Sequence, residues 1–316
     1  MGLVLTGAAL SAIAGTMSGT RDIAGDSAGG PPFRLDIAAR PGIPVLIAVP
    51  HAGRAYRPEL LDAMRDPGFT GLRLEDRLAD LVGRRVAAQT GAVLLVAHTP
   101  RAEIDLNRAP EDMDWTMVAD PPAGALAPGK RARSGLGLVP RRLVRVGELW
   151  RGPLPRAEIE RRLARIHGPY HAALSGALDT IADEWGSALL LDLHSMPPLP
   201  RAQPEREPPV YVLGDRFGAS CDAVLAAAAI GHFERLGRET AHNRPYAGGY
   251  VLERHAAPRR ARHAIQLEIC RSAYLDADLV EPGQGLGRVV REISGLVRTL
   301  AAELAERGSA RRLAAE

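Results

Sequence analysis

Short apolar runs alternate along this chain with longer stretches in which apolar residues recur every three or four positions. The short runs are rich in valine, isoleucine and leucine, and polar or Gly/Pro positions follow each of them. They predict five strands, over residues 43–49, 92–97, 188–193, 210–213 and 263–269. The alternation is typical of an α/β sheet, in which the catalytic groups lie in loops at strand ends.

The longer amphipathic stretches predict four helices, over residues 74–88, 156–184, 216–236 and 286–306. Pro169 lies inside the second of these, where we expect a bend because proline lacks a backbone N–H. Two Pro/Gly/Arg-rich stretches, residues 121–140 and 197–209, interrupt the rhythm and are predicted to be loops that cover a site.

The 316 residues are predicted to form a flexible N-terminal extension, residues 1–35, and a single α/β domain with loop insertions, residues 36–310. The apolar run at residues 3–14 is too short to span a membrane, and no Lys or Arg precedes it. A signal peptide is an alternative to the flexible extension.

The charge pattern argues against nucleic-acid binding. Net charge is only +3, the basic residues are scattered, and Lys130 is the single lysine among 40 cationic residues. Two cysteines, Cys221 and Cys270, are too few for a disulfide framework and lack a paired metal spacing. We therefore expect a cytoplasmic protein that acts on a small molecule and binds neither nucleic acid nor membrane.

Polar residues at the ends of buried strands suggest a metal site. His51 follows the first predicted strand and His194 follows the third, and a catalytic zinc ion needs three protein ligands with one position open. Arg54 stands where a short H-x-x-E pattern would put the third ligand. Glu75 and Asp76 lie near the start of a predicted helix, where neighbouring side chains point about 100° apart, so only one of them should face the metal. We favour Asp76 for that role, with Glu75 as the alternative.

Two further acidic residues are expected beside this metal site. Glu268 lies in an otherwise apolar strand, where an unused carboxylate would be costly to bury, so we expect it to accept and return a proton. An ion pair with Arg271 or another arginine is the alternative. Asp192 points to the same side of its strand as His194 and either supports that ligand or pairs with an arginine.

The segment RAEIDLNRAP follows the second predicted strand and carries Arg101, Asp105, Asn107 and Arg108. Guanidinium groups there could bind a substrate carboxylate in a bidentate manner, unless the segment is a structural salt-bridge cluster. Arg271 is a further candidate for substrate carboxylates. The segment from Tyr246 to Tyr250 is either a substrate loop, with Tyr250 as a contact, or a glycine turn.

Taken together, the motifs PHAG, LEDRLAD, RAEIDLNR, GPYH, LLDLHSMP, VLGDRFGASC, NRPYAGGY and QLEICR resemble the N-formylglutamate amidohydrolase family. The resemblance runs from about Ile43 to Tyr274. It implies a three-layer α/β fold, a mixed β-sheet flanked by helices, distantly similar to aspartoacylases and zinc carboxypeptidases. It also implies hydrolysis of N-formyl-L-glutamate, or a related N-acyl amino acid, to formate and glutamate in histidine breakdown.

The same resemblance implies roles for individual residues. His51, Asp76 and His194 match the metal positions of the family, and Glu268 matches its catalytic glutamate. Asn107 and Arg108 lie in a run similar to the substrate-binding run of aspartoacylases, with Arg108 as a candidate to hold the oxyanion. The alternatives are a carboxypeptidase-like zinc peptidase and a noncatalytic binding protein on the same fold.

Overall fold

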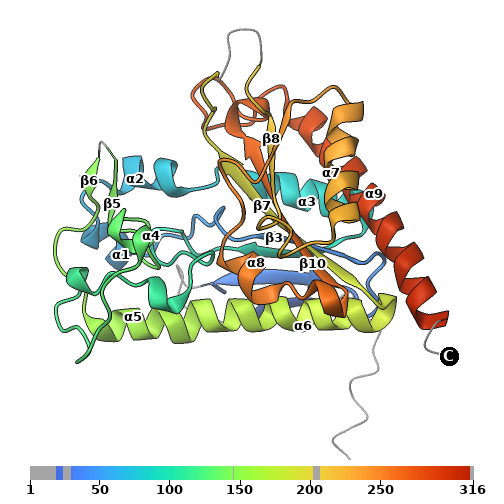
Figure 1. Ribbon diagram of the computed structural model, residues 1–316. Helices are drawn as coiled ribbons and strands as arrows, with labels where there is room; N and C mark the ends of the chain where they lie inside the picture. Colours follow the sequence, from blue (N-terminus) through green and yellow to red (C-terminus); the bar gives the residue numbers. More distant parts are fainter. Residues whose placement is uncertain (1–18, 24–29, 145, 202–206, 314–316) are drawn as a thin grey trace, which may run out of the picture.

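The fold is built on a mixed eight-stranded β-sheet with strand order β1-β2-β4-β3-β7-β10-β8-β9 (Figure 1). The computed structural model describes residues 19–23, 30–144, 146–201 and 207–313. In chain order the strands of the sheet are β1 (Gly19–Ile23), β2 (Phe33–Ile37), β3 (Val45–Val49), β4 (Val93–Ala97), β7 (Ala188–Met196), β8 (Tyr211–Gly214), β9 (Thr240–His242) and β10 (Arg262–Cys270). The neighbours β4, β3, β7 and β10 are parallel, whereas β2 and β8 run antiparallel to them.

All five predicted strands are confirmed, with ends shifted by up to three residues. They are the strands β3, β4, β7, β8 and β10, which are buried throughout except for Arg262 at the start of β10. The pattern did not indicate β2, which pairs with β4, or the short strand β9. The expected domain boundary after residue 35 falls inside β2, so the sheet begins earlier than predicted. The apolar run at residues 3–14 lies outside the described residues.

Helices cover both faces of the sheet, as the resemblance implied. The principal helices are α3 (Ala79–Thr90), α5 (Arg156–Arg162), α6 (Gly168–Trp185), α7 (Ala223–Arg235), α8 (Tyr250–His255) and α9 (Leu286–Leu313). The helices α3, α7 and α9 pack on one face and enclose a core with alternate residues of the strands, such as Val45 and Ile47. On the other face α6 and α8 enclose a second core with residues such as Leu46 and Ala48. We propose that these three layers form a single domain.

Two predicted helices begin later than the periodicity indicated. Leu74 ends α2 (Pro67–Leu74) instead of starting a helix, and Leu78 has a left-handed φ of 58°, so α3 starts only at Ala79. The helix predicted from residue 216 starts at Ala223, where Asp222 accepts a capping hydrogen bond from the Val224 N–H. Before it, the backbone at Arg216 and Phe217 also has positive φ.

The predicted helix over residues 156–184 is present and continues through Pro169. A π-helical turn, Leu163–His167, joins α5 to α6. Because Pro169 has no N–H, the regular hydrogen-bond ladder cannot pass through it, and a π-turn is one way to accommodate the loss.

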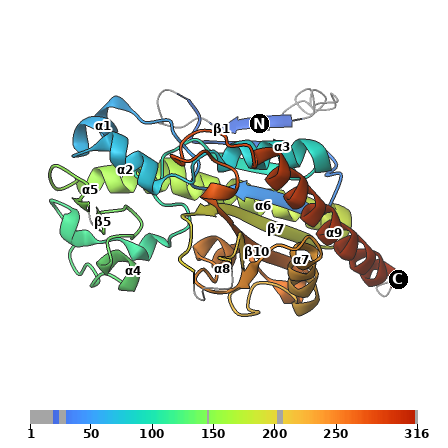
Figure 2. The same cartoon turned by 90° about the horizontal axis from the view of Figure 1, so that it is seen from above.

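A cluster of small elements extends the carboxyl ends of the parallel strands. It contains α1 (Pro58–Ala63), α2, α4 (Lys130–Arg133) and the hairpin β5 (Arg142–Leu143) and β6 (Gly147–Glu148). Both views show α1, α2, α4 and β5 together at one end of the molecule, away from α7 and α9 (Figures 1 and 2). Among the helices of the described ranges, none combines the length and apolar character needed to cross a membrane.

Candidate active site

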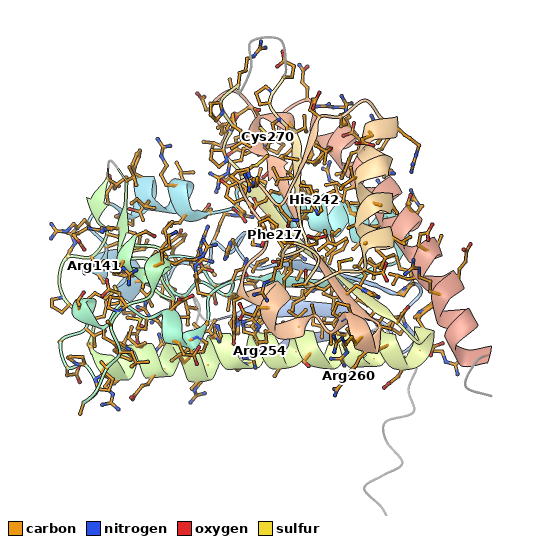
Figure 3. All side chains as sticks on the ribbon, in the orientation of Figure 1. Arg141, Phe217, His242, Arg254, Arg260 and Cys270 are labelled. Atoms are coloured by element: carbon orange, nitrogen blue, oxygen red, sulfur yellow. The ribbon has the colours of Figure 1, made fainter. Side chains whose placement is uncertain are left out.

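A cavity of about 310 Å³ opens where the carboxyl ends of β3, β7 and β10 meet the loops after them. Figure 3 marks this end of β10 with its last residue, Cys270, and the opposite end with Arg260, just before the strand. The cavity is lined by His51, Arg73, Asp76, Arg101, Asn107, Arg108, Arg131, Leu136, His194, Ser195, Pro197, residues 245–249, Gln266, Glu268 and Arg271. Stretch 121–140, predicted to cover a site, contributes Arg131 and Leu136.

The alternation of side chains along β7 places the polar groups in this cavity. Leu190 lies in the core under α6 and α8, and the next residues on the same face are Asp192 and His194. The parallel strand β10 follows the same plan, because its register pairs Gln266 with Asp192 and Glu268 with His194. One face of each strand thus changes from apolar to polar toward its carboxyl end, and this change forms the floor of the cavity.

Three buried side chains form a compact set of metal-ligand atoms. His51, Asp76 and His194 each offer one atom, and these atoms lie within 4.8 Å of one another. The Asp76 Oδ2 atom is 2.9 Å from His194 Nδ1 and 3.6 Å from His51 Nδ1. A hydrogen bond of 2.9 Å from the Asp76 N–H to the His51 carbonyl fixes the spacing of the two backbone segments.

The carboxylates of two further aspartates contact the Nε2 atoms of both imidazoles. His51 Nε2 lies 2.8 Å from Asp105 Oδ1, and His194 Nε2 lies 2.9 Å from Asp192 Oδ2. Because a carboxylate accepts a proton, each Nε2 carries a proton, and both Nδ1 atoms face Asp76. The pKa of Asp105 is well below its usual range: burial alone would raise it, but Arg101 and His51 outweigh burial. Asp105 is therefore ionised and able to hold His51 in this way.

The donor set fits a divalent metal ion. His51 Nδ1 is buried and has no hydrogen-bond partner among the described residues. Burial alone would lower the pKa of His194, but the carboxylates of Asp192 and Asp76 outweigh it and raise this pKa well above its usual range. The contact of 2.9 Å between His194 Nδ1 and Asp76 Oδ2 therefore holds a proton, which a bound metal ion would replace. Two imidazoles and one carboxylate, each imidazole oriented by a second carboxylate, are typical of catalytic zinc.

Asp76 rather than Glu75 belongs to this cluster. Glu75 turns away: its carboxylate accepts hydrogen bonds from the Tyr56 hydroxyl at 2.9 Å and from Arg77 Nη1 at 3.2 Å. The expectation that both acids begin a helix was wrong, because α2 ends at Leu74 and the chain turns before α3. In this turn, consecutive side chains point in opposite directions.

Glu268 lies beside the metal-ligand cluster with its carboxylate buried. Its Oε1 atom accepts a hydrogen bond of 2.8 Å from Gln266 Nε2. Burial, together with the negative charges of Asp76 and Asp192, raises the pKa of Glu268 to about 7, although His194 and Arg101 oppose the shift. A carboxyl group with this pKa can both accept and donate a proton near neutral pH.

Comparison with known proteins identifies the chain. The family model described as N-formylglutamate amidohydrolase matches residues 43–275, most of the chain. The chain belongs to the N-formylglutamate amidohydrolase family. Membership identifies it as a hydrolase, and the match begins just before β3 and ends just after β10, so it spans the whole cavity.

Individual members of this family are similar to the chain over most of their length. The N-formylglutamate deformylase of Pseudomonas aeruginosa is 31% identical over 275 residues, 79% of this chain and 91% of that protein. The N-formylglutamate deformylase of Pseudomonas putida is 32% identical over 259 residues, 77% and 88% of the two chains. A crystal structure of N-formylglutamate amidohydrolase from Ralstonia eutropha JMP134 superposes with a TM-score of 0.77 at 31% identity, covering 88% of this chain and 99% of that one.

In this family member, the three arginines predicted to bind substrate line the cavity, but protein groups already engage them. Arg101 Nε donates to Asp105 Oδ2 at 2.8 Å. Arg108 donates to the Leu136 and Asn107 carbonyls at 2.9 and 2.7 Å, and burial lowers its pKa. Arg271 donates to Ser195 Oγ and to the Glu75 carbonyl. The alternative reading of Glu268, an ion pair with Arg271 or another arginine, finds no support, because no ion pair of Glu268 occurs among the described residues.

Asn107 holds the predicted substrate loop in place, whereas Tyr250 is not among the residues that line the cavity. The Asn107 Oδ1 atom accepts a hydrogen bond of 2.8 Å from the Val251 N–H, and Gln266 Oε1 accepts one of 3.1 Å from the Gly249 N–H. Tyr250 is the first residue of α8, and its ring stacks on His167 with centroids 5.8 Å apart. A substrate contact from Tyr250 stays a prediction, whereas Tyr246 lines the cavity.

The cavity is also lined by Gln266, Arg73 and Arg131, which were not predicted from the sequence. A signal existed for Gln266, because it is polar and lies two residues before Glu268 in an apolar strand. None existed for Arg73 and Arg131, since arginine is common throughout this sequence.

Proposed function

We propose that this chain hydrolyses the amide bond of N-formyl-L-glutamate, or of a closely related N-acyl amino acid, with a zinc ion held by His51, Asp76 and His194. The observation that carries the proposal is the position of Glu268. A buried carboxyl group with a pKa of about 7 lies beside a His-Asp-His cluster, in a family of amidohydrolases. A role in histidine breakdown and a cytoplasmic location, where the buried thiols of Cys221 and Cys270 stay reduced, complete the proposal.

A zinc ion bound there would supply Lewis-acid activation of a water molecule and of the amide carbonyl. His51 and His194 would bind it through Nδ1, because Asp105 and Asp192 hold a proton at each Nε2.

Glu268 moves the proton. In its ionised form it accepts a proton from the attacking water as the new C–O bond forms. It then donates that proton to the amide nitrogen as the C–N bond breaks, so the products are formate and the free amine of glutamate, and the carboxylate is regenerated. The hydrogen bond from Gln266 fixes which way the carboxylate faces.

Arg108 is proposed to stabilise the negative charge that develops on the carbonyl oxygen. Its Nη2 atom makes no hydrogen bond to another described residue, whereas Nε and Nη1 are held by two backbone carbonyls. A guanidinium group fixed in this way needs no reorganisation during the reaction. Arg101, Asn107 and Arg271 form the wall against which the substrate is positioned.

The test is elemental analysis of the purified protein, followed by measurement of formate release from N-formyl-L-glutamate with and without a chelator. About one zinc per chain and chelator-sensitive formate release are expected. Zinc without formate release would overturn the substrate assignment and leave a metal-dependent hydrolase, such as a peptidase. Formate release that survives complete removal of metal would overturn the role of the His-Asp-His cluster.

A further inference from the structure

Five arginines line the cavity, and they differ in what their guanidinium groups do. The guanidinium groups of Arg101, Arg108 and Arg271 donate hydrogen bonds to other protein groups. Arg101 is also ion-paired with Asp105, and Arg271 with Asp76. These three were the residues that the sequence suggested for binding a diacid. Their existing partners make them better suited to shaping the site than to binding two more carboxylates.

Arg73 and Arg131 are different. Each lines the same cavity, yet neither guanidinium makes a hydrogen bond or ion pair with another described residue. Arg73, in the last turn of α2, lies over the Phe69 ring with its guanidinium carbon 5.0 Å from the ring centre, a contact that uses the flat face and leaves the N–H donors free. Arg131 lies on α4 and acts on Arg108 as a neighbouring positive charge.

The backbone holds both residues at the edge of the site. Asp66 caps α2, and Leu74 at its end is buried. The short helix α4 is anchored by buried Ala132, directly beside Arg131. The helices α2 and α4 therefore place at one cavity two guanidinium groups that have no hydrogen-bond or ion-pair partner among the described residues. Since a guanidinium binds a carboxylate with two parallel hydrogen bonds, each arginine can bind one carboxylate.

We infer that Arg73 and Arg131 bind the two carboxylates of the substrate and give the enzyme its preference for an N-acyl diacid over an N-acyl monoacid. This inference rests on the proposed amide hydrolase function. It assigns the recognition of the two substrate carboxylates to two residues outside the metal and proton-transfer groups.

The experiment compares kcat and KM of the zinc-loaded wild type with those of Arg73→Gln and Arg131→Gln. Three substrates are used. N-formyl-L-glutamate has both carboxylates, N-formyl-L-glutamine lacks the side-chain carboxylate, and the α-amide of N-formyl-L-glutamate lacks the α-carboxylate. Loss of one charged hydrogen-bonded pair corresponds to about a tenfold to hundredfold loss. We expect this loss in kcat/KM for the diacid, mainly through KM, and little change for the monoamide that already lacks the matching charge.

Arg133→Gln is the matched control, because Arg133 lies on the same helix and does not line the cavity, and its guanidinium group donates only to the Pro128 carbonyl among the described residues. Arg131→Lys should recover part of the loss, since it restores the charge without the bidentate geometry. Thermal melting of each variant excludes unfolding.

If Arg73→Gln and Arg131→Gln keep the wild-type preference for the diacid, the inference is overturned while the proposed function stands. A wild type that releases formate from none of the three substrates would instead overturn the proposed function. Equal losses on all three substrates would assign the two arginines a general structural role and also overturn the inference.

Discussion

Replacement of Glu268 by Gln tests the proposed chemistry with the smallest structural change. The side chain keeps its size and an oxygen that can accept the hydrogen bond from Gln266, but it can no longer accept a proton. General acid–base catalysis contributes about 10²- to 10⁴-fold, and we expect at least that loss in kcat. Zinc content should remain near the wild-type value, because Glu268 is not part of the His-Asp-His cluster.

The same substitution should change stability in a pH-dependent way. In the chelated protein, a pKa of about 7 in place of 4.5 means that ionising Glu268 costs the folded state about 3 kcal/mol. The folded pKa is raised, so the wild type has its full stability below pH 4.5 and loses this part as the pH rises through 7. The free energy of unfolding of Glu268→Gln should therefore exceed that of the wild type by up to about 3 kcal/mol at pH 8, and by little at pH 5.

Urea titration of both chelated proteins at pH 5 and pH 8 measures the difference, and steady-state formate release measures activity. Glu292→Gln is the control of opposite sign, because the buried Glu292 accepts hydrogen bonds from Tyr211 and Arg238 and its loss should destabilise the fold. Near-normal activity of Glu268→Gln would refute the proton-transfer role. Equal stability of variant and wild type at pH 8 would refute the reasoning about burial.

Three other predictions follow from the geometry of the site. Asp76→Asn should lose zinc and activity while Glu75→Gln keeps both, as measured by elemental analysis; zinc retention in Asp76→Asn would contradict the ligand assignment. Asp192→Asn should weaken zinc binding about 10- to 100-fold, because His194 loses the carboxylate that holds its Nε2 proton, and competition with a chelator would detect this. The kcat/KM of the wild type should fall about tenfold per pH unit on the acid side, because Glu268 must be ionised to accept a proton, and the residual activity of Glu268→Gln should lack this dependence.

The apolar strands and the residues at their ends could be predicted from the sequence, because burial on both faces demands continuous apolar runs. His51, His194 and Glu268 stood out for this reason, as charged or polar groups that a buried strand does not need. Their meeting in one cavity follows from strand order, since β3, β7 and β10 are adjacent and parallel. The motif resemblance supplied the activity, which the apolar pattern alone does not carry.

Local backbone conformation could not be predicted in the same way. The pattern gave a helix through Glu75 and Asp76, but α2 ends at Leu74 and α3 begins only after the left-handed Leu78, so both acids lie in the turn between the two helices. The direction of Tyr250 depended on where α8 begins and on the histidines it packs against. Arg73 and Arg131 line the cavity from the short helices α2 and α4. No sequence pattern distinguishes these two arginines from the many others in the chain.

The placement of the reacting groups on central strands has a consequence for how activity is lost on heating. His194 and Glu268 lie on two adjacent strands that are buried from end to end apart from Arg262, so they can separate only when the sheet itself opens. Asp76 lies in a turn between two helices, and Arg131 lies on a helix of four residues. Local opening at the rim should therefore release substrate and metal before the core exchanges its amide hydrogens, and cooling should restore the site without refolding of the sheet.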